Sequence, residues 1–390
     1  MSLYFKFNLE TKLTFKIFSK TQELPENWDD LAKETIFLSI AYLKILENAS
    51  PVNITCGYIG IFHDEKLVGI ALSQFFNLNK LESFGERDKC TKTFARNFIF
   101  RNFCSHVLLI GNNMFTGQNA FAFNPNYSDV SIVATLKLAT EQLQVELKKQ
   151  GFKVHIVSFK DFDASEIKAF KVPDFKNYYQ FCIQPNMVFT ISENWKSEQD
   201  YVDALSKKYR DQYKRARKKA SSLEKCKMTL ADIIEHEDVI FDLYIHVARN
   251  APFNTFFLPK NHFRIFKEHL KENFLFYGYF EKEKLVGFNT LIKNGTAMDT
   301  YFLGYDDVLQ KDKMLYLNML YDMIAYSIKK GYKDIIFART ALEIKSSVGA
   351  KPIKMYGFAV HNNKILNRCM STFFDFLEPK VIWNERNPFK

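Results

Sequence analysis

One short sequence occurs twice in this chain of 390 residues and constrains its fold more than any other feature. Residues 58–74 read YIGIFHDEKLVGIALSQ, and residues 276–292 read FYGYFEKEKLVGFNTLI, with EKLVG at the same place in both. Each copy has an apolar run, a short charged stretch and a second apolar run, which is typical of a β-hairpin with a tight turn. Because a repeated unit sets the architecture, we expect a duplicated domain.

A second pair of related stretches follows the hairpins in the same order. Residues 149–153 read KQGFK and residues 329–333 read KKGYK. Each stretch predicts the end of an amphipathic helix and the start of a strand. The first expected helix has apolar residues four or seven positions apart, at Ile132, Leu136, Leu143 and Leu147. The second has them three or four apart, at Met314, Leu317, Tyr321, Ile324 and Ile328. The expected strands are 154–159 and 334–337. We therefore predict two domains, 1–185 and 186–390.

Composition narrows the class of protein. A content of 47% hydrophobic residues in 390 is enough to bury two sizeable cores. The six cysteines lie far apart and form no CxxC or His/Cys cluster, so we expect no metal site, no disulfide scaffold and a reducing, cytoplasmic location. No apolar run approaches the ~20 residues that span a bilayer. The formal charge of +10 favours an anionic partner: a nucleotide cofactor, RNA or a membrane surface.

Much of the positive charge lies in residues 200–219, DYVDALSKKYRDQYKRARKK. Its aromatic and apolar residues fall at helical spacing, and basic residues cover the remaining faces. Such a helix can hold phosphates, an RNA backbone or acidic head-groups, or it can simply be a solvated surface. The candidate anion-binding residues are Lys208, Arg210, Lys214 and Arg217.

The order of elements resembles the GNAT acyltransferase superfamily, and the second half is similar to the two-domain Fem-type aminoacyl transferases of the peptidoglycan bridge. The stretches that carry this resemblance are LSKKYRDQYKRARKK from residue 205, GYDD from residue 304 and FARTALEIKSSVGAKP from residue 337. The resemblance implies an α/β (α+β) fold of two tandem GNAT-like domains, each with a mixed, mostly antiparallel sheet flanked by helices.

The same resemblance implies an activity. Such a protein transfers an acyl group from acyl-CoA, or an aminoacyl group from aminoacyl-tRNA, to an amine without a covalent enzyme intermediate. The donor is then a co-substrate and no cofactor is covalently bound. A tRNA and an anionic membrane are further partners to consider. An alternative from another class is a catalytically silent GNAT-fold module that docks RNA, a nucleotide or a membrane surface, because fold does not fix function.

The chain departs from the GNAT pattern where a glycine-containing loop usually cradles pyrophosphate. Residues 305–313 have three aspartates in YDDVLQKDK and no glycine, so a pyrophosphate would meet negative charge there. We expect Asp312 to be a helix N-cap. The better anion site lies in residues 339–354, where basic residues outnumber the single glutamate, although this stretch is alternatively a plain polar connection. Its predicted binding residues are Arg339, Thr340, Lys345 and Ser346.

Three residues on or near the expected central strand are candidates for proton transfer or for positioning the amine. They are Asp299, Tyr301 and Tyr305. A tyrosine in such a place is also a common packing residue.

Overall fold

The structure is a computed structural model that describes residues 13–80, 100–250, 254–377 and 383–390. The chain forms two compact units. Unit 1 comprises the described parts of residues 1–183, 253–258 and 354–380, and unit 2 those of residues 184–252, 259–353 and 381–390. The sequence analysis placed all of 186–390 in one domain, whereas residues 354–380 belong to unit 1 in the structure.

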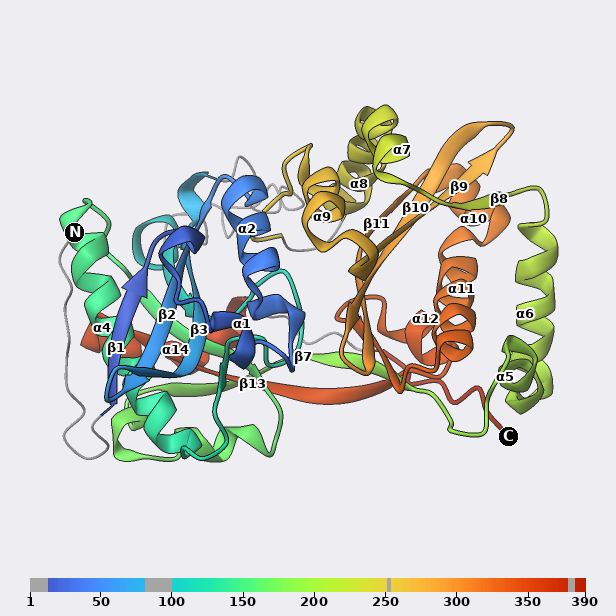
Figure 1. Ribbon diagram of the computed structural model, residues 1–390. Helices are drawn as coiled ribbons and strands as arrows, with labels where there is room; N and C mark the ends of the chain where they lie inside the picture. Colours follow the sequence, from blue (N-terminus) through green and yellow to red (C-terminus); the bar gives the residue numbers. More distant parts are fainter. Residues whose placement is uncertain (1–12, 81–99, 251–253, 378–382) are drawn as a thin grey trace. The chain divides into compact units, whose positions relative to one another are not determined.

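Unit 1 is built on strands in the order β1-β2-β3-β4-β6-β13, with β5 beside β3 (Figure 1). Neighbouring strands are antiparallel except β4 and β6, which are parallel. Its strands are β1 Leu13–Phe18, β2 Ile54–His63, β3 Lys66–Asn77, β4 His106–Ile110, β5 Phe121–Phe123, β6 Ile156–Phe162 and, from residue 354 on, β13 Lys351–His361. Its helices are α1 Trp28–Leu31, α2 Ile40–Ala49, α4 Asp129–Lys149, α13 Lys364–Arg368 and α14 Met370–Leu377.

Unit 2 has the strand order β7-β12-β11-β10-β9-β8, antiparallel except for β11 and β12. Its strands are β7 Tyr179–Thr190 from residue 184 on, β8 Glu224–Lys227, β9 Phe274–Glu281, β10 Lys284–Asn294, β11 Ala297–Tyr305 and β12 Asp334–Ala338. Its helices are α5 Glu198–Ala204, α6 Lys207–Lys219, α7 Leu230–Glu235, α8 Glu237–Asn250, α9 His262–Leu270, α10 Asp307–Lys313, α11 Leu315–Lys330 and α12 Leu342–Ser347. The predicted α/β architecture with mostly antiparallel, helix-flanked sheets is confirmed.

The two copies of EKLVG adopt the same local structure. Both turns place two consecutive residues at positive φ, which is the geometry of a type I′ hairpin turn: Asp64 (46°), Glu65 (65°), Lys282 (50°) and Glu283 (67°). Just after each turn one extra residue forms a β-bulge. Ile61 pairs with Gly69 and Phe62 with Leu67, which leaves Val68 unpaired, and the second copy leaves Val286 unpaired in the same way.

The helix and strand that follow each hairpin also agree with the predictions. Helix α4 ends before Gly151, with φ 88°, and α11 ends before Gly331, with φ 74°. Glycine adopts this left-handed conformation without a Cβ penalty, so it ends a helix. Strand β12 begins at Asp334 as predicted, and β6 begins at Ile156, two residues later than predicted.

Helices cover both faces of the unit 2 sheet (Figure 1). Helices α5, α6 and α11 bury one face through a core that includes Tyr201, Leu320 and Leu291. On the other face, Phe263 of α9 packs edge-on against two rings of β9 and β10. Helix α8 crosses β11 so closely that a Cβ at Gly304 would lie 2.6 Å from backbone carbon of Leu243. Only glycine fits there, which explains the glycine of GYDD.

Candidate active site

The parallel strands β11 and β12 separate shortly after they meet. Only residues 297–299 of β11 pair with residues 334–336 of β12. Beyond them, the Thr300 hydroxyl donates to the Ile336 carbonyl oxygen at 3.0 Å. Tyr301 and Phe302 then oppose the single residue Thr290 of β10, which makes a bulge in β11. A bulge disrupts the ladder and re-aims side chains, and bulges are common beside active sites.

The chain turns sharply where β12 ends. Ala338, Thr340 and Ala341 have φ values of 57°, 66° and 47°. Each is a left-handed conformation that costs a non-glycine residue free energy, of order 1–3 kcal/mol. Three such residues within four positions are held in place by the surrounding fold, and strain of this kind clusters at binding and catalytic sites.

Lys345 on α12 reaches back over this turn. Its side chain is buried, with 5% of the residue exposed. Its Nζ donates to the carbonyl oxygens of Arg339, at 2.6 Å, and Ala338, at 3.4 Å. No carboxylate among the described residues forms an ion pair with it, and burial lowers the pKa of its ammonium to about 7. An amine with that pKa can donate hydrogen bonds or exchange a proton near neutral pH.

The other predicted binding residues lie around the same turn. The Arg339 Nε donates to the Gln184 carbonyl oxygen at 3.3 Å, and Thr340 is exposed. Ser346 is fully buried, and its hydroxyl donates to the Glu343 carbonyl oxygen while accepting from the backbone N–H of Arg386. Arg339, Thr340 and Lys345 are thus brought together, whereas Ser346 holds the backbone.

One more buried polar group lies beside the turn. Asn186 precedes Met187, the β7 residue that pairs with Ala338. Its Oδ1 is buried and accepts no hydrogen bond from the residues that the structure describes. A buried oxygen without a partner costs free energy, and a bound ligand is one explanation for its persistence.

The three predicted catalytic residues divide between the two faces of β11. Asp299 is buried on the α9 face, receives a hydrogen bond from Asn294 Nδ2 at 3.1 Å, and has a pKa that burial raises to about 7. Tyr301 lies on the same face and contacts α9. Tyr305 faces the other way and packs near Tyr316 of α11. Asp299 and Tyr301 are therefore the pair that the strand brings to one side.

The acidic loop after β11 is occupied by its own capping interactions. Asp306 is the N-cap of α10, and its Oδ1 accepts from the backbone N–H groups of Val308 and Leu309 at 3.0 and 3.1 Å. The prediction that Asp312 is an N-cap is wrong, since Asp312 lies in the last turn of α10. The first N–H groups of this helix are thus satisfied by a carboxylate rather than left for a phosphate.

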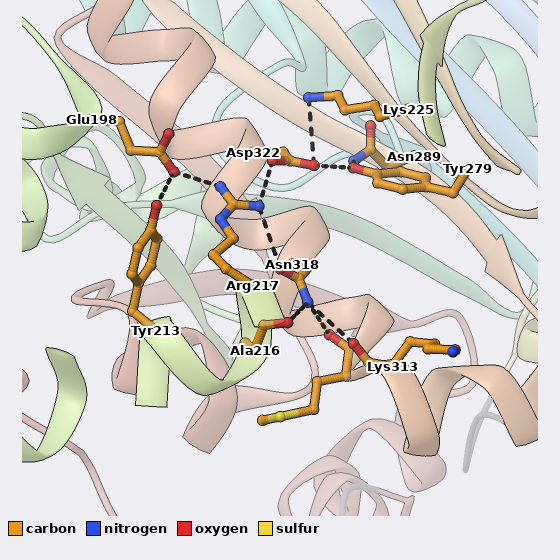
Figure 2. A network of polar contacts seen from close by, with 11 residues as sticks. Glu198, Tyr213, Ala216, Arg217, Lys225, Tyr279, Asn289, Lys313, Asn318 and Asp322 are labelled. Atoms are coloured by element: carbon orange, nitrogen blue, oxygen red, sulfur yellow. Dashed lines mark hydrogen bonds and ion pairs between the residues drawn. The ribbon is translucent and has the colours of Figure 1, made fainter. Parts of the chain in front are cut away.

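The predicted basic helix is α6. Some of its basic side chains form contacts within the fold, and others are exposed to solvent. Figure 2 shows Arg217 between Glu198 of α5 and Asp322 of α11, with which it forms ion pairs. Asp322 also accepts from the Tyr279 hydroxyl at 2.7 Å. Arg217 therefore joins three helices instead of facing solvent. Arg210 donates to the Leu205 carbonyl oxygen, whereas Lys208 and Lys214 are exposed.

Two polar pairs were not found from the sequence. His262 Nε2 lies 2.8 Å from the Tyr301 hydroxyl. In unit 1, Lys160 Nζ lies 2.9 Å from Asp161 Oδ2. A histidine at the start of an amphipathic helix carries no signal of its partner on a strand. The adjacent Lys-Asp in β6 gave some signal, because charged residues are rare inside a buried strand.

No protein-family model matches the sequence, and no curated protein matches it. Solved structures match over most of the chain. The crystal structure of FemX aligns with a TM-score of 0.50 at 12% identity, covering 91% of this chain and 99% of that one. A tandem GNAT protein from the clavulanic acid biosynthesis pathway aligns with a TM-score of 0.50 at 9% identity, covering 90% and 99%.

These similarities define the fold as that of the GNAT class. More narrowly, it is the tandem, Fem-type arrangement of two GNAT-like units, as the sequence resemblance implied. The crystal structure of a conserved protein of unknown function from Bacteroides thetaiotaomicron also aligns, with a TM-score of 0.50 at 12% identity over 92% of this chain and 99% of that one. At such identities the likeness concerns the fold alone.

Proposed function

We propose that the protein is an N-acyltransferase that moves an acyl or aminoacyl group to an amine without a covalent enzyme intermediate. The observation that carries the proposal is the buried Lys345, which no described carboxylate neutralises, at the strained turn where β12 leaves β11. In its charged form the ammonium donates a hydrogen bond to the carbonyl oxygen of the donor and stabilises the negative charge that develops there. Arg339 and Thr340 then bind the anionic part of the donor.

The amine must lose a proton as it attacks. Asp299 and Tyr301 come from the α9 face of β11, on the other strand of the diverging pair. A carboxyl group with a pKa near 7 is suited to accept a proton at neutral pH. We assign the proton-accepting side of the reaction to this strand and the carbonyl-binding side to Lys345.

Two donors are compatible with this chemistry, and the observations favour aminoacyl-tRNA over acyl-CoA. The first N–H groups of α10, in the loop after β11, are already satisfied by Asp306. The exposed Lys208 and Lys214 of α6 offer charge to a phosphate backbone. The acceptor is a small-molecule amine, and we place the reaction in the cytoplasm.

Thermal unfolding in the presence of candidate donors tests the proposal first. A ligand that binds the native state raises the midpoint by mass action. We expect pooled aminoacyl-tRNA to raise it, and coenzyme A or acetyl-CoA to raise it less. Arg339→Ala and Lys345→Ala should remove the rise, and Lys330→Ala, at an exposed lysine just after the buried part of α11, should keep it. Transfer of labelled acyl groups from either donor to a panel of amines then measures turnover.

A catalytically silent module that docks an anionic partner is the competing function, favoured by the capped α10 and the exposed lysines of α6. It predicts salt-sensitive binding of RNA, or sedimentation with anionic liposomes, without any transfer of label. Among the described residues there is no helix with the length and apolar character to span a bilayer. Turnover that disappears in Lys345→Ala would exclude the silent module.

A further inference from the structure

A buried hydrogen bond links the bulge of β11 to helix α9. Tyr301 is one of the two bulge residues, and its hydroxyl lies 2.8 Å from Nε2 of His262, the first residue of α9. Only 8% of Tyr301 and none of His262 is exposed. The two rings are nearly parallel, at 26°, with centroids 5.8 Å apart. The pair is therefore held both by its hydrogen bond and by ring packing.

Aromatic rings surround this pair. Phe266 stacks on Tyr301 with centroids 4.8 Å apart and lies 4.7 Å from the His262 ring, and Phe302 meets Tyr301 edge-on. Apolar surroundings disfavour the charged form of a buried imidazole. A neutral imidazole has one nitrogen that accepts a hydrogen bond and one that donates. If Nε2 is the acceptor, the Tyr301 hydroxyl donates to it and is aligned to pass its proton inward.

The position of Tyr301 makes this alignment relevant to the reaction. Tyr301 lies two residues beyond Asp299, where pairing with β12 ends, and Ala338 lies two residues beyond Ile336, the partner of Asp299. Tyr301 and Ala338 thus stand at the same level on the two separating strands. The Ala338 carbonyl oxygen is one of the two acceptors of Lys345. Tyr301 therefore lies on the part of β11 that has separated from β12, and Lys345 contacts the end of β12.

We propose that Tyr301 and His262 form a proton relay for acyl transfer, a step that rests on the proposed function. When the amine nitrogen bonds to the donor carbonyl carbon, an N–H proton moves to the Tyr301 oxygen while the tyrosine's own proton moves to His262 Nε2. When the intermediate collapses, the bond from that carbon to the donor's oxygen or sulfur breaks. The imidazolium returns its proton through Tyr301 to the leaving atom. Tyr301 is the catalytic residue and His262 its positioning residue.

The tautomer of His262 tests the relay without any substrate. In protein labelled with ¹⁵N-histidine, His262→Gln identifies the His262 resonances by their loss. We expect Nε2 to be unprotonated, and Tyr301→Phe to shift the Nε2 resonance while leaving Nδ1 nearly unchanged. A proton on Nε2 in the unsubstituted protein would overturn the relay, because Nε2 would then donate the hydrogen bond to the tyrosine and could not accept the tyrosine's proton.

Kinetics separate a relay from simple packing. Glutamine at position 262 can hydrogen-bond to Tyr301 but cannot carry a proton, so His262→Gln should lower turnover at saturating donor about 100-fold while leaving donor affinity unchanged. Tyr301→Phe should lower it equally, and the double variant no further. Wild-type turnover in His262→Gln contradicts the relay alone. If the unsubstituted protein transfers no label from acetyl-CoA or aminoacyl-tRNA, the proposed function fails and the relay with it.

Discussion

Each unit has one pair of parallel strands, and a lysine is buried where each pair ends. In unit 1, Lys160 of β6 pairs with Asp161 at 2.9 Å and donates to Asn113 Oδ1 at 3.1 Å. In unit 2, Lys345 donates to two backbone carbonyl oxygens, and no described carboxylate pairs with it. A paired buried charge is a structural element, whereas an uncompensated one is costly and marks a site with another purpose.

The environments of the two lysines explain the difference. The end of β4 and β6 is lined by polar side chains that contact each other, since the backbone N–H of Asn113 also donates to Gln74 Oε1. Asp161 occupies a bulge opposite β13, with φ 74°, a conformation that aspartate tolerates better than most residues. The corresponding end of β11 and β12 has a strained turn instead of a carboxylate. Both units thus bury a lysine near the end of their parallel strands, Lys160 within β6 and Lys345 on α12, and of these two only Lys160 forms an ion pair with a described carboxylate.

Removing the unit 1 lysine should have the largest effect on stability. Lys160→Met leaves Asp161 buried without its cation, and we expect the free energy of unfolding to fall by about 3–5 kcal/mol. Urea denaturation followed by circular dichroism measures it. Adding Asp161→Asn, which tolerates the same φ, should restore most of the loss. A loss below about 1 kcal/mol in the single variant would mean that this ion pair is not structural.

Removing the unit 2 lysine should do the opposite. Lys345→Met replaces an uncompensated buried amine with an apolar side chain of similar length, so stability at pH 7 should change little or rise. Turnover should fall about 100-fold, the usual loss of one donor to a developing oxyanion. Stability and turnover are measured on the same variant. If Lys345→Met lost as much stability as Lys160→Met and kept its turnover, both lysines would have a structural role only.

The same substitution should alter the pH dependence of stability. Lys345 has a pKa of about 7 in the fold against an ordinary value of 10.5, so the unfolded chain binds its proton first as pH falls. The free energy of unfolding should therefore decrease as the pH falls from 10.5 to 7. Denaturation midpoints across that range should slope in the unsubstituted protein and be flatter in Lys345→Met, whereas Lys330→Met should keep the slope.

The ion pairs of Arg217 test whether unit 2 also contains a charged residue that stabilises the fold, as Lys160 does in unit 1. Arg217→Met leaves Glu198 and Asp322 without their shared cation, and because the arginine side chain is 28% exposed we expect a loss of about 2 kcal/mol. Lys214→Met on the exposed face of α6 should change stability by less than about 0.5 kcal/mol. It should instead weaken RNA binding, which nitrocellulose filter binding at two salt concentrations would measure. Equal effects on stability would remove the distinction between the two faces of α6.

A histidine in unit 1 should give the smallest effect. His155 stacks beside His106, and burial and the neighbouring histidines lower its pKa to about 4. Because the unfolded histidine binds a proton near pH 6.5, stability should decline as pH falls from about 6.5 to 4 and level off below. The half-exposed site limits the loss to about 1–2 kcal/mol. His155→Gln should flatten the decline, and an unchanged slope would show that another group causes it.

Local features of the fold were predictable from short stretches of sequence. The two hairpins, the glycines that end α4 and α11, and the central position of β11 were all expected, and so was the tandem GNAT-like fold. The predicted binding residues Arg339, Thr340 and Lys345 lie at one turn of the structure, and their role stays a prediction. The roles of Arg217 and Asp312 were not predicted. The role of Arg217 depends on a carboxylate that approaches from another helix, and that of Asp312 depends on where a helix ends.

The sequence by itself determined the turns, bulges and helix ends, because each depends on a few adjacent residues. EKLVG forms the same turn and bulge in both units, so five residues are enough to specify them. Only the tertiary structure decided that Lys345 reaches the carbonyl oxygens at the end of β12, that Arg217 forms ion pairs with two other helices, and that His262 meets Tyr301. Those contacts join residues on different elements, and burial sets their energies, since solvent no longer screens the charges.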